Sequence, residues 1–167
     1  MMNNKHKTAY LARAAVIAAL YVSLTYLSAA FGLSGQGLVQ LRFSEALCVL
    51  PYFTAAAVPG VTLGCLIANI LTGAHVLDIV FGTLATLLGA IGTRLLRKSK
   101  FLAPLPPVFF NTLIVPFVLR YAYFTTDVAF PILFLSVGAG EILSCYLLGL
   151  VLLFALDKHR KVLFGEN

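Results

Sequence analysis

The sequence predicts an all-α integral membrane protein built as a bundle of six transmembrane helices. Its 167 residues are 60% hydrophobic and only 11% charged, and the mean hydropathy is +0.97, whereas soluble domains are about half apolar and a quarter charged. At about 20 residues per span, this length holds roughly six helices. We therefore expect one six-helix transmembrane domain over residues 1–167 and no soluble domain.

The breaks between apolar runs define the expected spans. The first run follows a basic flank and continues past Ala30 without a clear cleavage site, so we expect a retained helix rather than a signal peptide. Residues 46–77 carry no charge and are too long for one span, and Pro51 and the pair Pro59–Gly60 are expected to divide them into two short helices. The expected spans are about 11–30, 43–58, 60–73, 78–96, 103–121 and 130–156.

The distribution of basic residues predicts the orientation. With six spans and a cytoplasmic N-terminus, ten of the twelve Lys and Arg residues fall inside, and only Arg42 and Arg120 fall outside. A five-span arrangement would place the basic C-terminal cluster on the wrong side. The positive-inside rule therefore favours six spans with both termini cytoplasmic. The outer half is then slightly acidic, which suits a cationic or hydrogen-bond-donating ligand.

The polar segment QLRFSE, residues 40–45, interrupts the apolar sequence after a glycine-rich loop at 32–39. If Arg42 and Glu45 are both helical, they lie on one face and can pair. If Ser44 is instead the N-cap, Glu45 falls in the first helical turn and Arg42 hangs free in the loop. Both alternatives place Gln40, Arg42 and Glu45 at the external mouth, where they are candidates for a lid.

Four further polar residues lie on apolar spans. Glu141 is about 15 Å along the last span, and a charge near the bilayer centre costs at least a few kcal/mol, so it requires a ligand or a partner. Asn69 and Asn111 can read the polar edge of a heterocycle, or they can make ordinary interhelical bonds. Asp78 lies in the first turn of its span, where the helix dipole alone favours an acid.

Small residues on the first span form two interleaved A-x-x-x-A patterns, Ala14 with Ala18 and Ala15 with Ala19. Such patterns let another helix backbone approach closely. The approaching helix can belong to the same chain or to a partner subunit, and the sequence leaves both alternatives open.

Chemical motifs do not accompany these polar residues in the sequence. The three cysteines lie in apolar runs without metal-ligand spacing, so we expect them to be buried small hydrophobes. No G-x-x-x-x-G-K-[ST] loop is present, so ATP-driven transport would need separate subunits. No nucleophile lies beside a base, and we expect no catalytic residue, no metal and no cofactor.

Five segments occur in an order typical of one transporter family. They are VQLRFSEALCVLPYF, PGVTLGCLIANILTG, DIVFGTLATLLGA, PVFFNTLIVPF and GAGEILSCYLLG. From about Ala12 to Gly149 the chain resembles the QueT-type queuosine-precursor transporters, the substrate-binding S-components of energy-coupling factor (ECF) transporters. The resemblance implies a protein of the bacterial plasma membrane that captures a micronutrient from outside. It also implies a transmembrane coupling subunit and two cytoplasmic ATPases as partners.

The resemblance further implies a 7-deazaguanine ligand: the aminomethyl base preQ1, the nitrile preQ0 or queuine. Glu141 would then accept hydrogen bonds from the ring N–H and the exocyclic amine of the base. Asn69 or Asn111, with Gln40, would complete that pattern.

The aminomethyl substituent of such a base carries an ammonium charge, which Asp78 or Glu45 would neutralise. The alanine patterns of the first span resemble the motif by which S-components dock on the coupling subunit. The alternatives are an S-component for another vitamin and a self-sufficient proton-coupled carrier that uses Glu141 and Asp78 as a relay.

Overall fold

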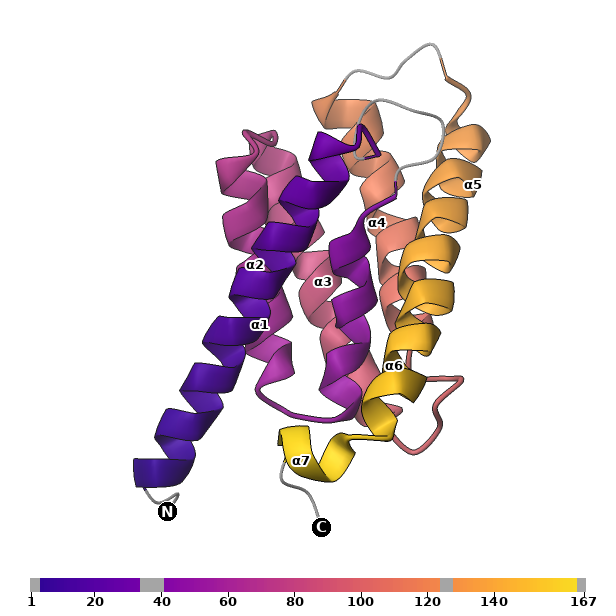
Figure 1. Cartoon of the computed structure of the whole chain (residues 1–167). Coiled ribbons are helices and arrows are strands. Elements are labelled where there is room, and N and C mark those ends of the chain that lie inside the picture. The colour runs from indigo at the N-terminus through magenta and orange to yellow at the C-terminus, as the bar shows by residue number, and fades with distance from the viewer. Residues whose placement is uncertain (1–3, 34–40, 124–127, 165–167) are drawn as a thin grey trace.

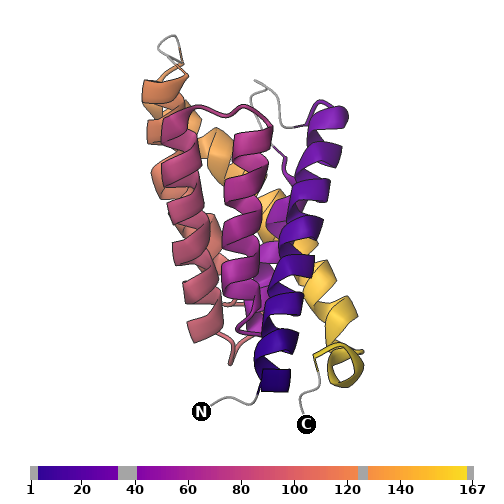
Figure 2. The same ribbon diagram turned by 90° about the vertical axis from the view of Figure 1, so that its left-hand side faces the viewer.

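The chain folds into a bundle of roughly parallel and antiparallel helices. The structure, a computed structural model, describes residues 4–33, 41–123 and 128–164, and every regular element in these ranges is helical. Figure 1 shows the start of α1 and the short α7 at the same end of the bundle, and Figure 2 shows α1, α2 and α3 side by side. The elements are α1 Asn4–Ala30, η1 Phe43–Tyr52, α2 Ala57–Leu71, α3 Val76–Leu95, α4 Leu105–Ala122, α5 Phe130–Glu141, η2 Ile142–Leu148, α6 Gly149–Asp157 and α7 Arg160–Phe164.

Four helical stretches in the described ranges are long and apolar enough to cross a membrane: His6–Ala30, Val76–Leu95, Leu105–Ala122 and Phe130–Asp157. The last of these is the continuous rod formed by α5, η2 and α6. The helix α2 is apolar but shorter, and η1 has ten residues. The predicted all-helical membrane class is confirmed, while the count of six spans and the sidedness of the termini stay predictions.

The surface of the bundle carries many large apolar side chains. Leu95, Leu135 and Val151 are each about two-thirds or more exposed, as expected of side chains that face lipid. Small residues dominate the buried positions, and polar groups lie among them. The buried polar residues are Thr25, Ser28, Ser44, Glu45, Thr54, Asn69, Asp78, Thr86, Thr93, Asn111 and Ser144.

The short helix η1 occupies the centre of the bundle. Eight of its ten residues are buried, and it contacts α1, α2, α3, η2 and α6. Its tight 3-10 geometry rises about 2.0 Å per residue, so ten residues reach about 20 Å into the bundle. Its first backbone N–H groups have side-chain acceptors from two other elements: the Arg42 N–H donates to Ser144 Oγ at 3.2 Å, and the Phe43 N–H donates to Ser28 Oγ at 2.8 Å.

The boundary between η1 and α2 differs from the sequence prediction. The chain turns at residues 53–56, so the first helix ends at Tyr52 rather than near residue 58. Pro51 lies inside η1, and Pro59 lies in the first turn of α2. A proline is tolerated there because the first backbone N–H groups of a helix have no helical acceptor. The predicted break at Pro59–Gly60 was therefore wrong.

Glycines let α1 and α2 approach closely. A Cβ atom at Gly64 would lie 2.6 Å from Tyr21 Cβ and 3.1 Å from Ala18 Cα, and one at Gly60 would lie 3.0 Å from the Ala14 carbonyl oxygen. Ala14 and Ala18 are therefore buried against α2 of the same chain. Ala15 and Ala19 are exposed, so only half of the predicted alanine face is available to a partner.

The end of the bundle that carries α7 is closed by side-chain contacts. Lys100 Nζ lies 2.6 Å from Asp157 Oδ2 and links the α3–α4 connection to the end of α6. This hydrogen bond raises the pKa of Lys100 above its ordinary value. The Phe164 ring of α7 stacks on Phe53, with the ring centroids 4.9 Å apart.

Gly64→Ala is expected to destabilise the protein by about 1–3 kcal/mol, because the added methyl group overpacks the α1–α2 interface. The free energy of unfolding in detergent measures this effect. Gly138→Ala is the matched control, since its Cβ would meet only the Thr112 side chain, at 3.3 Å. Equal stability of the two variants would contradict the close α1–α2 contact.

Candidate functional site

A polar cavity lies inside the bundle between η1, α2, α3, α4 and α5. Its volume is about 30 Å³, room for little more than ordered water. Five of the seven predicted ligand-contacting residues line it, although they come from distant parts of the sequence. The lining residues are Arg42, Glu45, Cys65, Asp78, Gly82, Thr86, Asn111, Val115, Val137 and Glu141.

The other two predicted residues have different positions. Asn69 is buried beside the cavity, where its Nδ2 lies 3.4 Å from the Asp78 carbonyl oxygen and 3.6 Å from Cys65 Sγ. It therefore supports the wall of the cavity. Gln40 lies outside the described residues, as do residues 34–39 of the loop that was expected to cover the site.

Glu141, the last residue of α5, provides the clearest vacancy for a hydrogen-bond donor. Its Oε2 atom is buried and has no hydrogen-bond partner within residues 4–33, 41–123 and 128–164. The Asn111 side chain of α4 lies close to this carboxyl group. The wider π-type turns of η2 begin directly after Glu141, and such turns are frequent at functional sites.

Glu45 has neutral donors on both carboxylate oxygens. The Tyr21 hydroxyl donates to Oε1 at 2.6 Å, and Cys48 Sγ lies 3.2 Å from Oε2. Ser44 is not the N-cap residue, because Arg42 occupies that position and Ser44 Oγ lies 2.9 Å from Thr25 Oγ1. Both alternatives for QLRFSE were therefore wrong in part: Glu45 is in the first turn, but Arg42 neither pairs with it nor hangs free.

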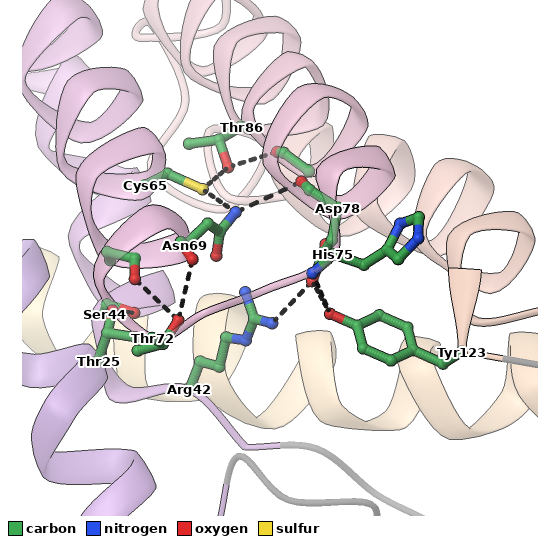
Figure 3. A network of polar contacts seen from close by, with 12 residues as sticks. Thr25, Arg42, Ser44, Cys65, Asn69, Thr72, His75, Asp78, Thr86 and Tyr123 are labelled. Atoms are coloured by element: carbon green, nitrogen blue, oxygen red, sulfur yellow. Dashed lines mark hydrogen bonds and ion pairs between the residues drawn. The ribbon is translucent and has the colours of Figure 1, made fainter.

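Arg42 faces Asp78, as Figure 3 shows. Arg42 Nη2 lies 3.8 Å from Asp78 Oδ2, and the Tyr123 hydroxyl donates to the same oxygen at 3.1 Å. Burial raises the pKa of the Tyr123 phenol, and the Asp78 charge adds to this shift, so the phenol remains a donor. The His75 N–H donates to the Tyr123 oxygen at 3.1 Å, and His75 Nδ1 accepts from the Leu77 N–H at the start of α3.

Two small residues that sequence reasoning missed, Gly82 and Thr86, also line the cavity. Thr86 Oγ1 lies 3.0 Å from the Gly82 carbonyl oxygen and 3.3 Å from Cys65 Sγ. A Cβ atom at Gly82 would lie 2.9 Å from Asp78 Oδ1, so a glycine keeps the space beside that carboxylate open. The available signal was the i, i+4, i+8 spacing of Asp78, Gly82 and Thr86, which places them on one helix face.

The chemistry of the lining favours binding a small polar molecule over holding a metal. Within the described ranges, no group of three or more His, Cys, Asp or Glu side chains has a metal-binding arrangement. The cavity instead offers carboxylate and amide groups that accept and donate hydrogen bonds. Cys48, Cys65 and Cys145 are free thiols and buried.

A second hollow, of about 390 Å³, lies on the outer face between α3 and α4. Leu77 and Phe81 of α3 and Phe117 and Tyr121 of α4 line part of it. Of the residues that the structure describes, none with a charged side chain lines this hollow, and Tyr121 is 67% exposed. It resembles the lipid-facing surface around it and offers little to a polar ligand.

Long apolar helices around a buried polar cavity define a helical membrane protein with a polar interior site. The QueT transporter family model matches residues 11–158, and the chain belongs to this family. The match is to a family of transporters and not to a family of enzymes.

One curated relative is the queuosine precursor transporter QueT of Lactococcus lactis subsp. cremoris (strain MG1363), which is 38% identical over 97 residues. The matched segment covers 58% of this chain and 56% of that relative, so the chain matches just over half of the relative's length. No solved structure matches the chain.

Tyr21→Phe is expected to destabilise the protein by about 1–3 kcal/mol, because it leaves the buried Glu45 Oε1 without its donor. Tyr26→Phe makes the same chemical change on the same helix at a 45% exposed site and should cost less. Unfolding of both variants in detergent compares them. A larger effect at Tyr26 would contradict the role assigned to Tyr21.

Proposed function

We propose that this protein is the substrate-binding subunit of an ATP-driven ECF-type importer that captures a queuosine precursor outside a bacterial cell. The observation that carries this proposal is the polar cavity, where Arg42, Glu45, Asp78, Asn111 and Glu141 come together. Membership of the QueT transporter family supports the transport role. The name of the Lactococcus relative supports the substrate class, a 7-deazaguanine such as preQ1, preQ0 or queuine.

The hydrogen-bonding pattern of the cavity suits a guanine-like edge. Glu141 Oε2, which has no donor among the described residues, is an acceptor for the ring N–H and the exocyclic amine of the base. The Asn111 amide offers both a donor and an acceptor to the same edge. Asn69 holds the wall behind Asp78.

Ligand binding requires the cavity to widen. Pockets for small ligands commonly enclose about 300–1,000 Å³, far more than the 30 Å³ here. Arg42 belongs to the extended backbone just before η1, and its side chain is 26% exposed. Its ion pair with Asp78 measures 3.8 Å, a long separation for such a pair. We assign Arg42 the role of a side chain that withdraws to admit the ligand.

ATP-driven import places further requirements on partners and topology. The sequence has no phosphate-binding loop, so two cytoplasmic ATPases and a transmembrane coupling subunit supply the energy, and this chain needs no cofactor. We assign the docking surface to the exposed Ala15 and Ala19 of α1, since Ala14 and Ala18 are already covered by α2. The topology is six spans in the bacterial plasma membrane, with both termini cytoplasmic.

Gly82→Ala is expected to weaken binding of the aminomethyl base at least tenfold, because its methyl group would press on Asp78 Oδ1 at 2.9 Å and take up cavity space. Calorimetry of the purified protein in detergent measures the affinity, with one-to-one binding expected for the unmodified chain. Gly138→Ala is the control and should bind normally. Equal affinity of all three proteins would place the ligand elsewhere.

Ala15→Leu with Ala19→Leu is expected to reduce co-purification of the coupling subunit at least fivefold, since larger side chains keep the partner helix at a distance. Binding of the deazaguanine by the isolated protein should not change. Val151→Leu, an exposed change on α6, serves as the control. Normal assembly of the double variant would exclude this docking surface, and deazaguanine flux by the chain alone in liposomes would favour a proton-coupled carrier instead.

A further inference from the structure

The charges that line the cavity do not balance. Glu45, Asp78 and Glu141 contribute three carboxyl groups, and Arg42 contributes the one guanidinium among the described lining residues. Arg42 lies 3.8 Å from Asp78, which pairs one cation with one acid. Among the residues that the structure describes, Glu45 and Glu141 have no cationic partner in the cavity.

Several elements that pack around these two acids each contribute an uncharged group. Because a buried carboxylate without a countercharge is costly by several kcal/mol, the pair needs a proton or a further cation to offset its charge. The uncharged groups are Tyr21 of α1, Cys48 of η1, Cys65 of α2, Thr86 of α3, Asn111 of α4 and Cys145 of η2. The other charged groups that line the cavity are Arg42 and Asp78, and the Tyr123 hydroxyl donates to Asp78.

The two acids differ in what they can still accept. Glu141 Oε2 has no donor within the described part of the chain and fits the N–H groups of the guanine edge. Glu45 already accepts hydrogen bonds from Tyr21 and Cys48, but each carboxylate oxygen has a second lone pair that can accept a hydrogen bond from an ammonium group. Glu45 is only 4% exposed, so solvent cannot compensate its charge.

We propose that Glu45 makes the site selective for charge, so that it binds 7-deazaguanines that carry an ammonium group in preference to neutral ones of the same shape. This inference rests on the proposed function. An ammonium ligand brings its own positive charge and displaces the proton held by the acid pair to solvent. A neutral ligand leaves that proton in place. Amine binding therefore releases about one proton more than nitrile binding does.

Calorimetry with the aminomethyl base and the nitrile base, at pH 6, 7 and 8, tests the proposal. The unmodified protein is expected to bind the amine at least tenfold more tightly than the nitrile at pH 7. The ratio of the two affinities should rise with pH, by up to tenfold per unit for one displaced proton. Repeating the titrations in buffers of different ionisation enthalpy counts the protons directly.

Three variants identify the residue. Glu45→Gln should reduce the preference for the amine at least tenfold while the nitrile still binds. Glu141→Gln should weaken both bases, because it alters the acceptor for their common edge. Asp157→Asn removes the same charge at the Lys100 pair, outside the cavity, and should leave the ratio unchanged.

Equal affinity for the two bases, or a preference that survives in Glu45→Gln, would overturn the charge selection by Glu45. If Glu45→Gln fails to fold, the unmodified protein still decides, because a ratio that does not change with pH also overturns it. Failure of the unmodified protein to bind either base would instead refute the proposed function.

Discussion

The hydrogen bond from Tyr21 to Glu45, at 2.6 Å, satisfies the constraint on which the bundle depends. Glu45 lies in a buried helix surrounded by other helices, away from lipid and bulk water, and is only 4% exposed. Its donors must therefore come from the chain itself. Tyr21, Thr25 and Ser28 recur along one face of α1, and all three contact the start of η1 through side-chain hydrogen bonds. The polar content of η1 thus fixes where α1 packs.

The same arrangement positions the cavity. Because the start of η1 is anchored to Ser28 of α1 and Ser144 of η2, Arg42 is held between α3 and the last long helix, where it can reach Asp78. Gly82 leaves the space beside that carboxylate empty. The apolar end of η1, by contrast, packs against Phe164 of α7 through Phe53, just beyond its last residue. One end of the central helix therefore serves structure, and the other end supplies the polar site.

Composition predicted the membrane class because lipid contact requires a largely apolar chain, and isolated charges such as Glu141 stood out because lipid penalises them. Small neutral residues give no such signal, so Gly82 and Thr86 were missed. The Arg42–Asp78 pair joins residues on different elements, and sequence spacing cannot reveal that contact. The helix boundary near Pro59 failed for a local reason, since a proline is acceptable in a first turn as well as in a loop. Sequence periodicity grouped the four alanines of α1 into one docking face, but the structure buries two of them and exposes the other two.

A buried acid without a countercharge destabilises the folded protein, and this free-energy cost makes such acids useful in binding. Breaking or omitting one partner of a buried pair typically costs about 3–5 kcal/mol, and a ligand that supplies the missing charge recovers part of that energy as affinity. Glu45 and Glu141 occupy this position in the cavity, whereas Asp78 already has Arg42. Such a site binds most tightly the ligand whose positive charge and hydrogen-bond donors match the unpaired carboxyl groups. The free-energy cost of these acids in the free protein and the selectivity for the ligand therefore have the same physical origin.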